Sequence, residues 1–220
     1  LGLYATFVTI QRSRRRSGLP GSWHEWPEGL RDPGSAAVAA FAATHAGDVE
    51  AVGFAQRELD AQIEAVARSA RRAGLRLGIY QDLAVGSSSD SADTWMAPAL
   101  FAESVSVGAP PDAYAPEGQD WGFPPLDPHR SRADGHRFFA ALLRASFASA
   151  GALRIDHAMG LARLFWIPRG RPGSEGTYVA YPAAELLGVL ALESRRAGAL
   201  VIAEDLGTVP EGFRPLLREW

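Results

Sequence analysis

The sequence of 220 residues contains no cysteine. Disulfide bonds, thiolate nucleophiles and cysteine-ligated zinc are therefore excluded within this chain, and the absence fits a reducing cytoplasm, which is the location we expect. No run approaches the roughly 20 consecutive apolar residues of a membrane span. The apolar stretch LGLYATFVTI at the start lacks the basic region and small-residue cleavage site of a signal peptide. We expect no membrane partner.

An excess of one charge is also missing, because 22 basic and 25 acidic residues give a formal net charge of −3. This balance gives no reason to expect nucleic acid or an anionic membrane as a partner. One basic cluster occurs, RSRRR at residues 12–16. It is short and has no interleaved aromatic residue, so we interpret it as a solvated loop.

The motifs of nucleotide, serine and metal chemistry are absent as well. No GxGxxG follows an expected strand, and neither GxxxxGK[ST] nor GxSxG occurs. The 5 histidines show no metal-ligand spacing such as HExxH. We therefore expect no cofactor and no metal, and the sequence indicates no particular protein partner.

What the chain does contain is a repeated unit in which a helical pattern, a glycine, a short apolar run and an acid follow one another. The units are Gly74 to Asp82, Gly151 to Asp156 and Gly198 to Glu204. Glycine suits the left-handed position just past a helix end. Apolar runs this short between helices are typical of buried parallel strands, so the pattern predicts an α/β fold.

Acids at the ends of parallel strands have a special position, because ligands bind at the carboxyl edge of such sheets. A single acid there is equally compatible with capping the next helix or pairing with a nearby arginine. Acids on successive strands, Asp82, Asp156 and Glu204, favour a shared site. The chain is therefore predicted to be an enzyme.

Retaining glycosyl chemistry is the reaction that fits Asp156 and Glu204 best. It needs a nucleophilic carboxylate and a carboxyl acid/base about 5–5.5 Å apart, a spacing that neighbouring strand ends can provide. Arg154 lies two positions before Asp156, on the same face of the expected strand, where it would hold that carboxylate ionised or form a structural salt bridge. His157 either contacts the substrate or is structural.

The remaining sequence divides into helical and irregular segments. We expect residues 11–34 to be an irregular linker and residues 35–74 to be a helical lead-in, with a short helix over 35–45. The lead-in ends in an apolar stripe that should pack against the following strand. The stripe consists of Leu59, Ile63, Val66 and Ala70. Further helical patterns precede Gly151 and Gly198.

Residues 87–134 are rich in serine and proline and are expected to be irregular. An irregular segment of this length inside a compact domain is usually functional or disordered, and its aromatic residues argue against disorder. We interpret it as an ordered active-site loop. The alternative is an excursion that packs only against its own aromatic side chains.

Long stretches of the chain, in order, closely resemble the amylomaltases, the 4-α-glucanotransferases of glycoside hydrolase family 77. The stretches are GIYQDLAVG (78–86), SVGAPPDAYAPEGQDWGFPPLDPH (106–129), GALRIDHAMGLARLFWIP (151–168) and VIAEDLGTVP (201–210). The resemblance covers most of the chain from about Leu59 onward. The loop and GTYVAYPAAELLGVLALESRR (176–196) are most similar to the bacterial maltodextrin-utilising branch.

The resemblance implies a (β/α)₈ barrel that moves α-1,4-glucan segments through a covalent glucosyl-enzyme intermediate. It implies that Asp156 is the nucleophile and Glu204 the general acid/base. Arg154 and His157 would contact the reacting glucose and the nucleophile. The substrates would be maltodextrins and related α-1,4-glucans, and no cofactor would be needed.

The same resemblance places Asp112, Gln119 and Trp121 in a flexible substrate-binding loop beside the acceptor subsites, and Asp82 at the border of the pocket. The family carries a third acid in a His-Asp motif on a later strand, and no His-Asp pair follows Glu204 here. We therefore expect residues 1–220 to be the central segment of a catalytic barrel that is incomplete at both ends. The alternatives are an α-glucan hydrolase of the same clan and an inactive glucan-binding fragment.

Overall fold

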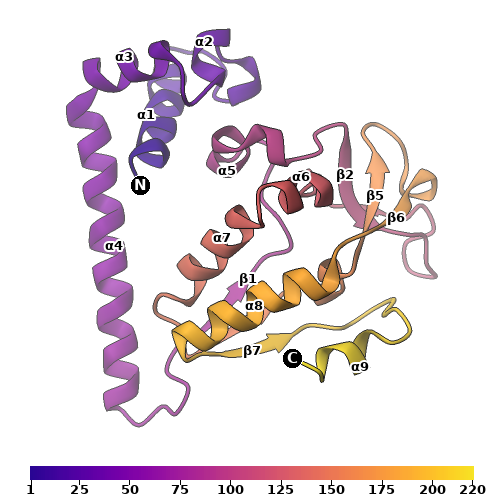
Figure 1. Cartoon of the computed structure of the whole chain (residues 1–220). Coiled ribbons are helices and arrows are strands. Elements are labelled where there is room, and N and C mark those ends of the chain that lie inside the picture. The colour runs from indigo at the N-terminus through magenta and orange to yellow at the C-terminus, as the bar shows by residue number, and fades with distance from the viewer. The chain divides into compact units, whose positions relative to one another are not determined.

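The computed structural model describes all 220 residues, which separate into two compact units. One unit contains residues 1–65 and 88–98, and the other contains residues 66–87 and 99–220. Figure 1 labels most of their helices and strands. None of the helices combines the length and the apolar character that crossing a bilayer requires.

The first unit is built from helices around a tryptophan-rich core. Its elements are α1 (Gly2–Arg16), η1 (Trp23–Glu25), α2 (Glu28–Arg31), α3 (Ala36–Thr44), the first part of α4 (Ala46–Arg72) and α5 (Ala92–Met96). Trp26 and Trp95 are fully buried and pack with Phe7. The Trp95 indole N–H donates to the carbonyl of Leu30 at 2.9 Å, so this buried polar group is satisfied.

The expectation that residues 11–34 form an irregular linker is wrong for its first part. Helix α1 continues to Arg16, so the basic cluster forms the last turns of a helix and is not a loop. Positive side chains near a helix C-terminus interact favourably with the helix dipole, which explains their position. Trp23 and Trp26 also lie within residues 11–34, and both are buried in the core of the first unit. A segment rich in glycine and proline can therefore still contribute aromatic side chains to a core.

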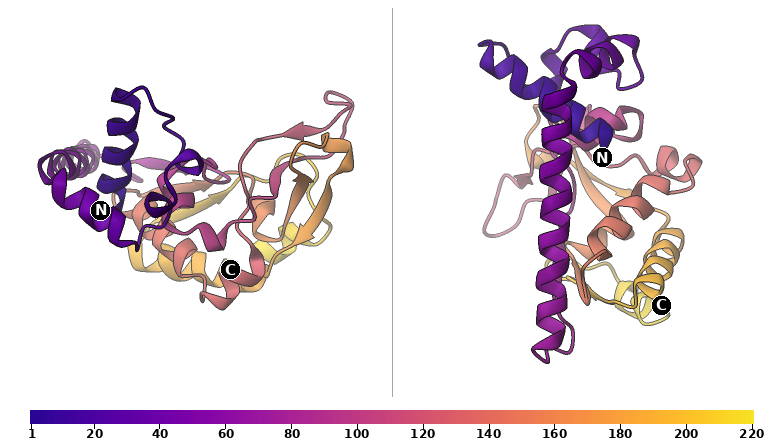
Figure 2. Two further views of the ribbon diagram at one scale, coloured as in Figure 1. Left: turned by 90° about the horizontal axis from the view of Figure 1, so that it is seen from above. Right: turned by 90° about the vertical axis from the view of Figure 1, so that its left-hand side faces the viewer.

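The lead-in region is helical, as expected, and α4 extends from Ala46 to Arg72 as one continuous helix (Figure 2). Its predicted apolar stripe is not a buried face, because Leu59 is 47% and Val66 is 59% exposed. The buried positions include Val52 and Ala67. Periodicity shows which face of a helix is apolar but not whether another segment covers it.

The second unit contains a parallel three-stranded sheet in the order β1-β4-β7. The strands are β1 (Tyr80–Leu83), β4 (Ala152–Ile155) and β7 (Leu200–Ala203). Helix α7 (Arg137–Phe147) precedes β4, and helix α8 (Ala183–Ala197) precedes β7, as the helical patterns before Gly151 and Gly198 predict. Leu153 and Ile155 of β4 are buried in a cluster with Leu143, Leu187 and other residues of the helices. Burying each such side chain stabilises the folded state by about 1.5–3 kcal/mol relative to leaving it exposed. The predicted α/β class is confirmed.

The first strand of the sheet begins later in the chain than the apolar pattern from Leu75 predicts. Leu75 and Leu77 are 56% and 47% exposed and lie in a turn, whereas β1 begins at Tyr80. Asp82 therefore lies inside the strand and pairs in register with Arg154, instead of following the strand. The alternation of Leu75, Leu77 and Ile79 predicts a strand that starts too early, because a short apolar run does not define its own boundary.

The glycines that were expected past helix ends have two different roles. Gly74 and Gly198 have the predicted positive φ of +86° and +64°. Gly151 does not, and its N–H donates to the carbonyl of Ile79 at 2.8 Å. A Cβ at Gly151 would lie 1.4 Å from the carbonyl oxygen of Leu77, so glycine is required here by the close approach of two backbones.

An antiparallel sheet in the order β3-β2-β5-β6 completes the second unit. It consists of β2 (Val105–Ala109), β3 (Gln119–Asp120), β5 (Arg163–Pro168) and β6 (Thr177–Ala180). Two of these strands, helix α5 and helix α6 (Pro128–Ala133) lie in residues 87–134, so the prediction that this segment is irregular is wrong for these parts. Within residues 87–134, β2 contains Gly108 and β3 is only two residues long, so neither segment has a clear strand pattern in the sequence. Helix α9 (Phe213–Leu217) is the last element.

Candidate active site

Asp156 and Glu204 occupy equivalent positions at the carboxyl edge of the parallel sheet. Strands β4 and β7 are neighbours, with Ile155 opposite Ala203, and each acid follows the last paired residue of its strand. The Asp156 N–H donates to the carbonyl of Leu83 at 3.0 Å, and the Glu204 N–H donates to that of Ile155 at 3.0 Å. Both acids are thus held by continuing the ladder of the sheet, as the sequence predicted.

The carboxylate of Glu204 is held by backbone donors from two loops. The N–H of His157 donates to one carboxylate oxygen at 2.9 Å, and the N–H of Leu206 donates to the other at 3.0 Å. The Glu204 carbonyl in turn accepts from the N–H of Ala158 at 2.8 Å. These bonds connect the loops after β4 and β7 and fix the orientation of the Glu204 side chain.

Arg154 lies between two acids. Its guanidinium donates to both carboxylate oxygens of Asp82 at 2.9 Å, and it forms an ion pair with Asp156 at 2.6 Å. The hydrogen bond with Asp82, reinforced by the negative charges of both acids, raises the pKa of Arg154 above its ordinary value. A permanent positive charge therefore lies beside Asp156 at every pH at which the protein is folded.

His157 has an unusual backbone conformation, with φ at 48° in the left-handed region. Non-glycine residues adopt this region rarely, and such residues concentrate at functional sites. Its ring meets Trp121 edge-on, with centroids 5.3 Å apart. Burial lowers the pKa of His157 below its ordinary 6.5, against the opposing charges of Glu204 and Asp156, so the imidazole is neutral at pH 7.

A pocket of about 430 Å³ brings most of the predicted residues together. Its lining includes Trp121, Arg154, Asp156, His157 and Glu204. The pocket thus combines a carboxylate beside a cation, a second carboxylate held by backbone donors, a neutral imidazole and an aromatic face. We refer to it below as the acid pocket. No group of three or more His, Cys, Asp or Glu side chains is arranged to hold a metal ion.

The other predicted residues lie outside the lining. Asp82 is not part of the lining, but it forms an ion pair with Arg154, which is. Gln119 is on β3, and its side-chain oxygen accepts from the Trp121 indole N–H at 3.1 Å. Asp112 is exposed, and its carboxylate accepts from the N–H groups of Tyr114 and Ala115 at 2.8 and 2.7 Å, which stabilises the turn of the loop.

Several lining residues were not identified from the sequence, among them Val85, Gly86, Phe123 and Leu206. Phe123 stacks beside Trp121 with centroids 6.2 Å apart. A Cβ at Gly86 would lie 2.6 Å from the Phe123 ring, so glycine allows this ring to approach the chain after β1. The glycine after β1 and the aromatic residues of the loop were the sequence signals for this contact.

Comparisons with known proteins agree on one family. A family model described as 4-alpha-glucanotransferase matches residues 1–220. The 4-alpha-glucanotransferase of Mycobacterium tuberculosis is 46% identical over 195 residues, which cover 89% of this chain and 27% of that protein. The protein of the same name from Haemophilus influenzae is 42% identical over 198 residues, covering 90% and 28%. The chain thus spans about a quarter of the length of these relatives.

Solved structures give the same result. The crystal structure of amylomaltase from Corynebacterium glutamicum matches with a TM-score of 0.80 and 34% identity, covering 99% of this chain and 28% of that one. The amylomaltase from Streptococcus agalactiae in complex with acarbose matches with a TM-score of 0.86, covering 99% and 44%, and at 22% identity it bears on the fold alone. These likenesses confirm the predicted fold class, an α/β chain forming part of a (β/α)₈ barrel.

Proposed function

Since the chain belongs to the 4-alpha-glucanotransferase family, glycoside hydrolase family 77, we propose that it carries the nucleophile and the acid/base of an enzyme that transfers α-1,4-glucan segments between maltodextrins. The observation that carries this proposal is the position of Asp156 and Glu204 at adjacent strand ends, facing one acid pocket. Their unequal surroundings support unequal roles, because only Asp156 is paired with a cation.

In the first step, a carboxylate oxygen of Asp156 attacks the anomeric carbon of the donor glucan and the glycosidic bond breaks. Glu204, in its acid form, delivers its proton to the departing glycosidic oxygen. The product is a glucosyl ester of Asp156 together with a shortened glucan. The ion pair with Arg154 at 2.6 Å orients the attacking carboxylate.

In the second step, the Glu204 carboxylate removes the proton from the 4-hydroxyl of an acceptor glucan, and that oxygen attacks the anomeric carbon of the ester. The Asp156 carboxylate departs, and an α-1,4 bond is formed with net retention. The backbone N–H groups of His157 and Leu206 hold Glu204 throughout, so its protonation changes without a change of position.

Trp121 supports transfer to a sugar in preference to water. Its indole is anchored by Gln119, and its ring lies beside His157 at the acid pocket. Aromatic faces bury the apolar faces of sugar rings and displace water. In this proposal Trp121 and Gln119 contribute to the acceptor subsite, neutral His157 bonds a sugar hydroxyl, and Asp112 shapes the loop that approaches the acceptor.

Hydrolysis on the same site is the alternative, because Asp156 at 36% side-chain exposure is open to solvent. Incubation of the natural full-length protein with maltotriose distinguishes the two. Transfer yields glucose together with oligomers longer than maltotriose, whereas hydrolysis yields only shorter sugars. An absence of any product would instead favour the glucan-binding alternative. The α-glucan partner and a cytoplasmic location belong to the same proposal.

A further inference from the structure

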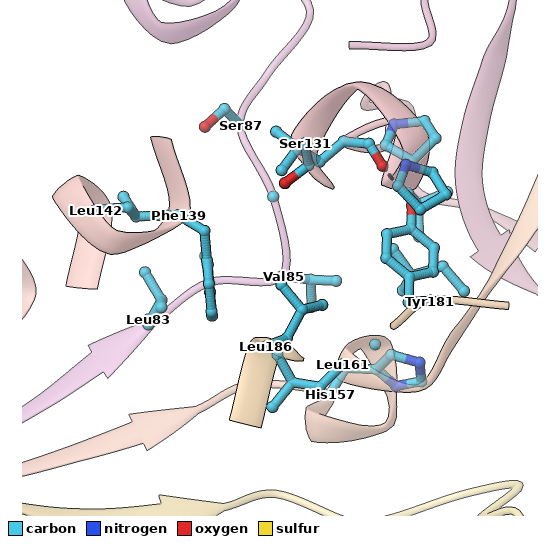
Figure 3. A pocket seen from close by; sticks show the side chains of 18 of the residues that line it. Leu83, Val85, Ser87, Ser131, Phe139, Leu142, His157, Leu161, Tyr181 and Leu186 are labelled. Atoms are coloured by element: carbon cyan, nitrogen blue, oxygen red, sulfur yellow. Dashed lines mark hydrogen bonds between the residues drawn. The ribbon is translucent and has the colours of Figure 1, made fainter. Parts of the chain in front are cut away.

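Figure 3 shows side chains that line a second cavity, of about 280 Å³. Its lining includes Asp156 and His157, which also line the acid pocket, as do Ala84, Val85, Gly86 and Phe123. We call it the apolar chamber. It is lined mainly by apolar side chains from β1, α7, the 3-10 helix η3 (Ala158–Leu161), β5 and α8, among them Leu83, Phe139, Leu142, Leu161, Leu164 and Leu186. An apolar cavity of roughly 150 Å³ already accepts benzene, so the apolar chamber has room for a substituted ring.

The polar part of the lining includes Ser131 and His136, which begin a chain of hydrogen bonds that ends at the partly exposed Glu185. Ser131 Oγ lies 2.9 Å from His136 Nδ1, and His136 Nε2 lies 3.0 Å from a carboxylate oxygen of Glu185. Ser131 is 3% and His136 is 6% exposed. His136 also has a left-handed φ of 54°, a conformation that is uncommon for histidine and that persists only when the surroundings enforce it.

Glu185 determines the direction of these hydrogen bonds. The hydrogen bond from His136, with a further contribution from Arg132, lowers the pKa of Glu185 below its ordinary value. As a carboxylate it can only accept, so His136 Nε2 donates to it. With a neutral imidazole, Nδ1 then accepts the Ser131 hydroxyl proton, and the lone pairs of Ser131 stay available. With a charged imidazole, Nδ1 donates and the Ser131 proton is available instead.

The Ser131 hydroxyl at the chamber wall can therefore accept a hydrogen bond from a ligand when His136 is neutral, and it can donate one when His136 is charged. A ligand hydroxyl satisfies both cases, because it can donate and accept. A sugar does not fit the apolar chamber, since most of its hydroxyls would be buried without partners, at a cost of about 1–3 kcal/mol each. The ligand chemistry is thus an apolar ring with a single hydroxyl.

We propose that the apolar chamber is a binding site for a small uncharged phenol or cyclic alcohol, with its hydroxyl on Ser131 and its ring among the leucine and phenylalanine side chains. The site differs from the glucan site in ligand chemistry, although the two share Asp156 and His157. A ligand bound in the apolar chamber would lie beside Asp156 and His157, which also line the acid pocket.

The test uses p-cresol and toluene as matched probes and measures their binding to the natural full-length protein by titration calorimetry and ligand-detected NMR. The wild-type protein should bind both, and p-cresol about 2- to 10-fold more tightly because of the Ser131 hydrogen bond. Ser131→Ala should abolish this preference and leave toluene binding intact. Because binding is measured directly, the result does not depend on whether the protein transfers glucan.

Filling the apolar chamber provides the second arm of the test. Leu142→Trp places a larger side chain into the lining, and Leu186→Phe does so from α8 if the first variant does not fold. Either variant should lose both probes, whereas Leu192→Trp, at a position that is 49% exposed on α8, should bind them like the wild type. Equal binding of the probes to the filled and control variants would overturn the proposal, as would no binding to the wild type.

Discussion

The backbone N–H of His157 donates to the carboxylate of Glu204 at 2.9 Å, so the residue that follows the proposed nucleophile positions the proposed acid/base. A change in the loop after β4 therefore reaches both carboxylates at once. Because the Glu204 backbone is also bonded to Ile155 and Ala158, the two strand ends behave as one unit. The variants considered below are all variants of the natural full-length protein.

Asp156→Asn and Glu204→Gln should each lower the rate of maltotriose disproportionation by roughly 10²-fold or more, since one removes the nucleophile and the other the proton donor. A donor with fluoride as the leaving group, α-glucosyl fluoride, separates their roles, because fluoride departs without a proton. The first turnover of fluoride release, measured as a burst, should be largely retained in Glu204→Gln and lost in Asp156→Asn, whereas later turnovers of Glu204→Gln should be slow because the second step lacks its base. The exposed Glu58→Gln on α4 is the control. Fluoride release by Asp156→Asn at the wild-type rate would contradict the assignment.

Arg154→Lys should lower kcat by about 10-fold or more, because an ammonium group cannot hold Asp82 and Asp156 in the same planar arrangement as the guanidinium. Asp82→Asn should have a smaller effect of the same kind. The double variant should be no worse than Arg154→Lys alone, because Asp82 acts through Arg154. Steady-state kinetics of the three variants tests this, and independent, additive losses would show that Asp82 acts by another route.

Burial lowers the pKa of His157 in the folded protein below the ordinary value of 6.5. Between these two pKa values the unfolded chain binds the proton and the folded chain does not. This contribution to the free energy of unfolding is therefore present above pH 6.5 and is lost as the pH falls through the lower, folded-state pKa. His157→Asn, which tolerates a left-handed backbone, should reduce this pH dependence in urea titrations. An unchanged dependence would contradict the role of His157.

Trp121→Ala should weaken acceptor binding and increase the ratio of hydrolysis to transfer several-fold, because the aromatic face that covers the acid pocket is removed. Tyr114→Ala is a matched control on the same loop, since Tyr114 is 99% exposed. Quantified maltotriose products give the ratio for both variants. If both variants shift the ratio equally, the effect belongs to the loop in general and not to Trp121.

Gly151→Ala should destabilise the protein by several kcal/mol or prevent folding, because the added Cβ would lie 1.4 Å from the Leu77 carbonyl oxygen. Gly198→Ala should fold, and its free energy of unfolding should fall by about 1 kcal/mol, since the added Cβ contacts no other atom and only the positive φ is unfavourable. Thermal unfolding of the two variants gives the comparison. A mild effect at Gly151 would mean that β1 and the segment before β4 can move apart.

The positions of Asp156 and Glu204 could be predicted because they depend on local features. Each acid follows a short apolar run, and parallel strands present their carboxyl ends at one edge of a sheet. The end of α8 at Gly198 was readable for the same reason, because a left-handed residue is needed where that helix stops. The roles proposed for the two acids came from the family resemblance, which rests on several long motifs that occur in the same order as in the amylomaltases.

The sequence by itself thus determined the α/β class, the strand-end acids and the family. Only the tertiary structure decided that Asp82 lies inside β1, where it meets Arg154 across the sheet, because register depends on pairing with a partner strand. It likewise decided the antiparallel sheet that holds Trp121 and the close approach at Gly151. The apolar chamber was also beyond prediction, since a cavity is defined by residues far apart in the chain, and local periodicity carries no record of which of them meet.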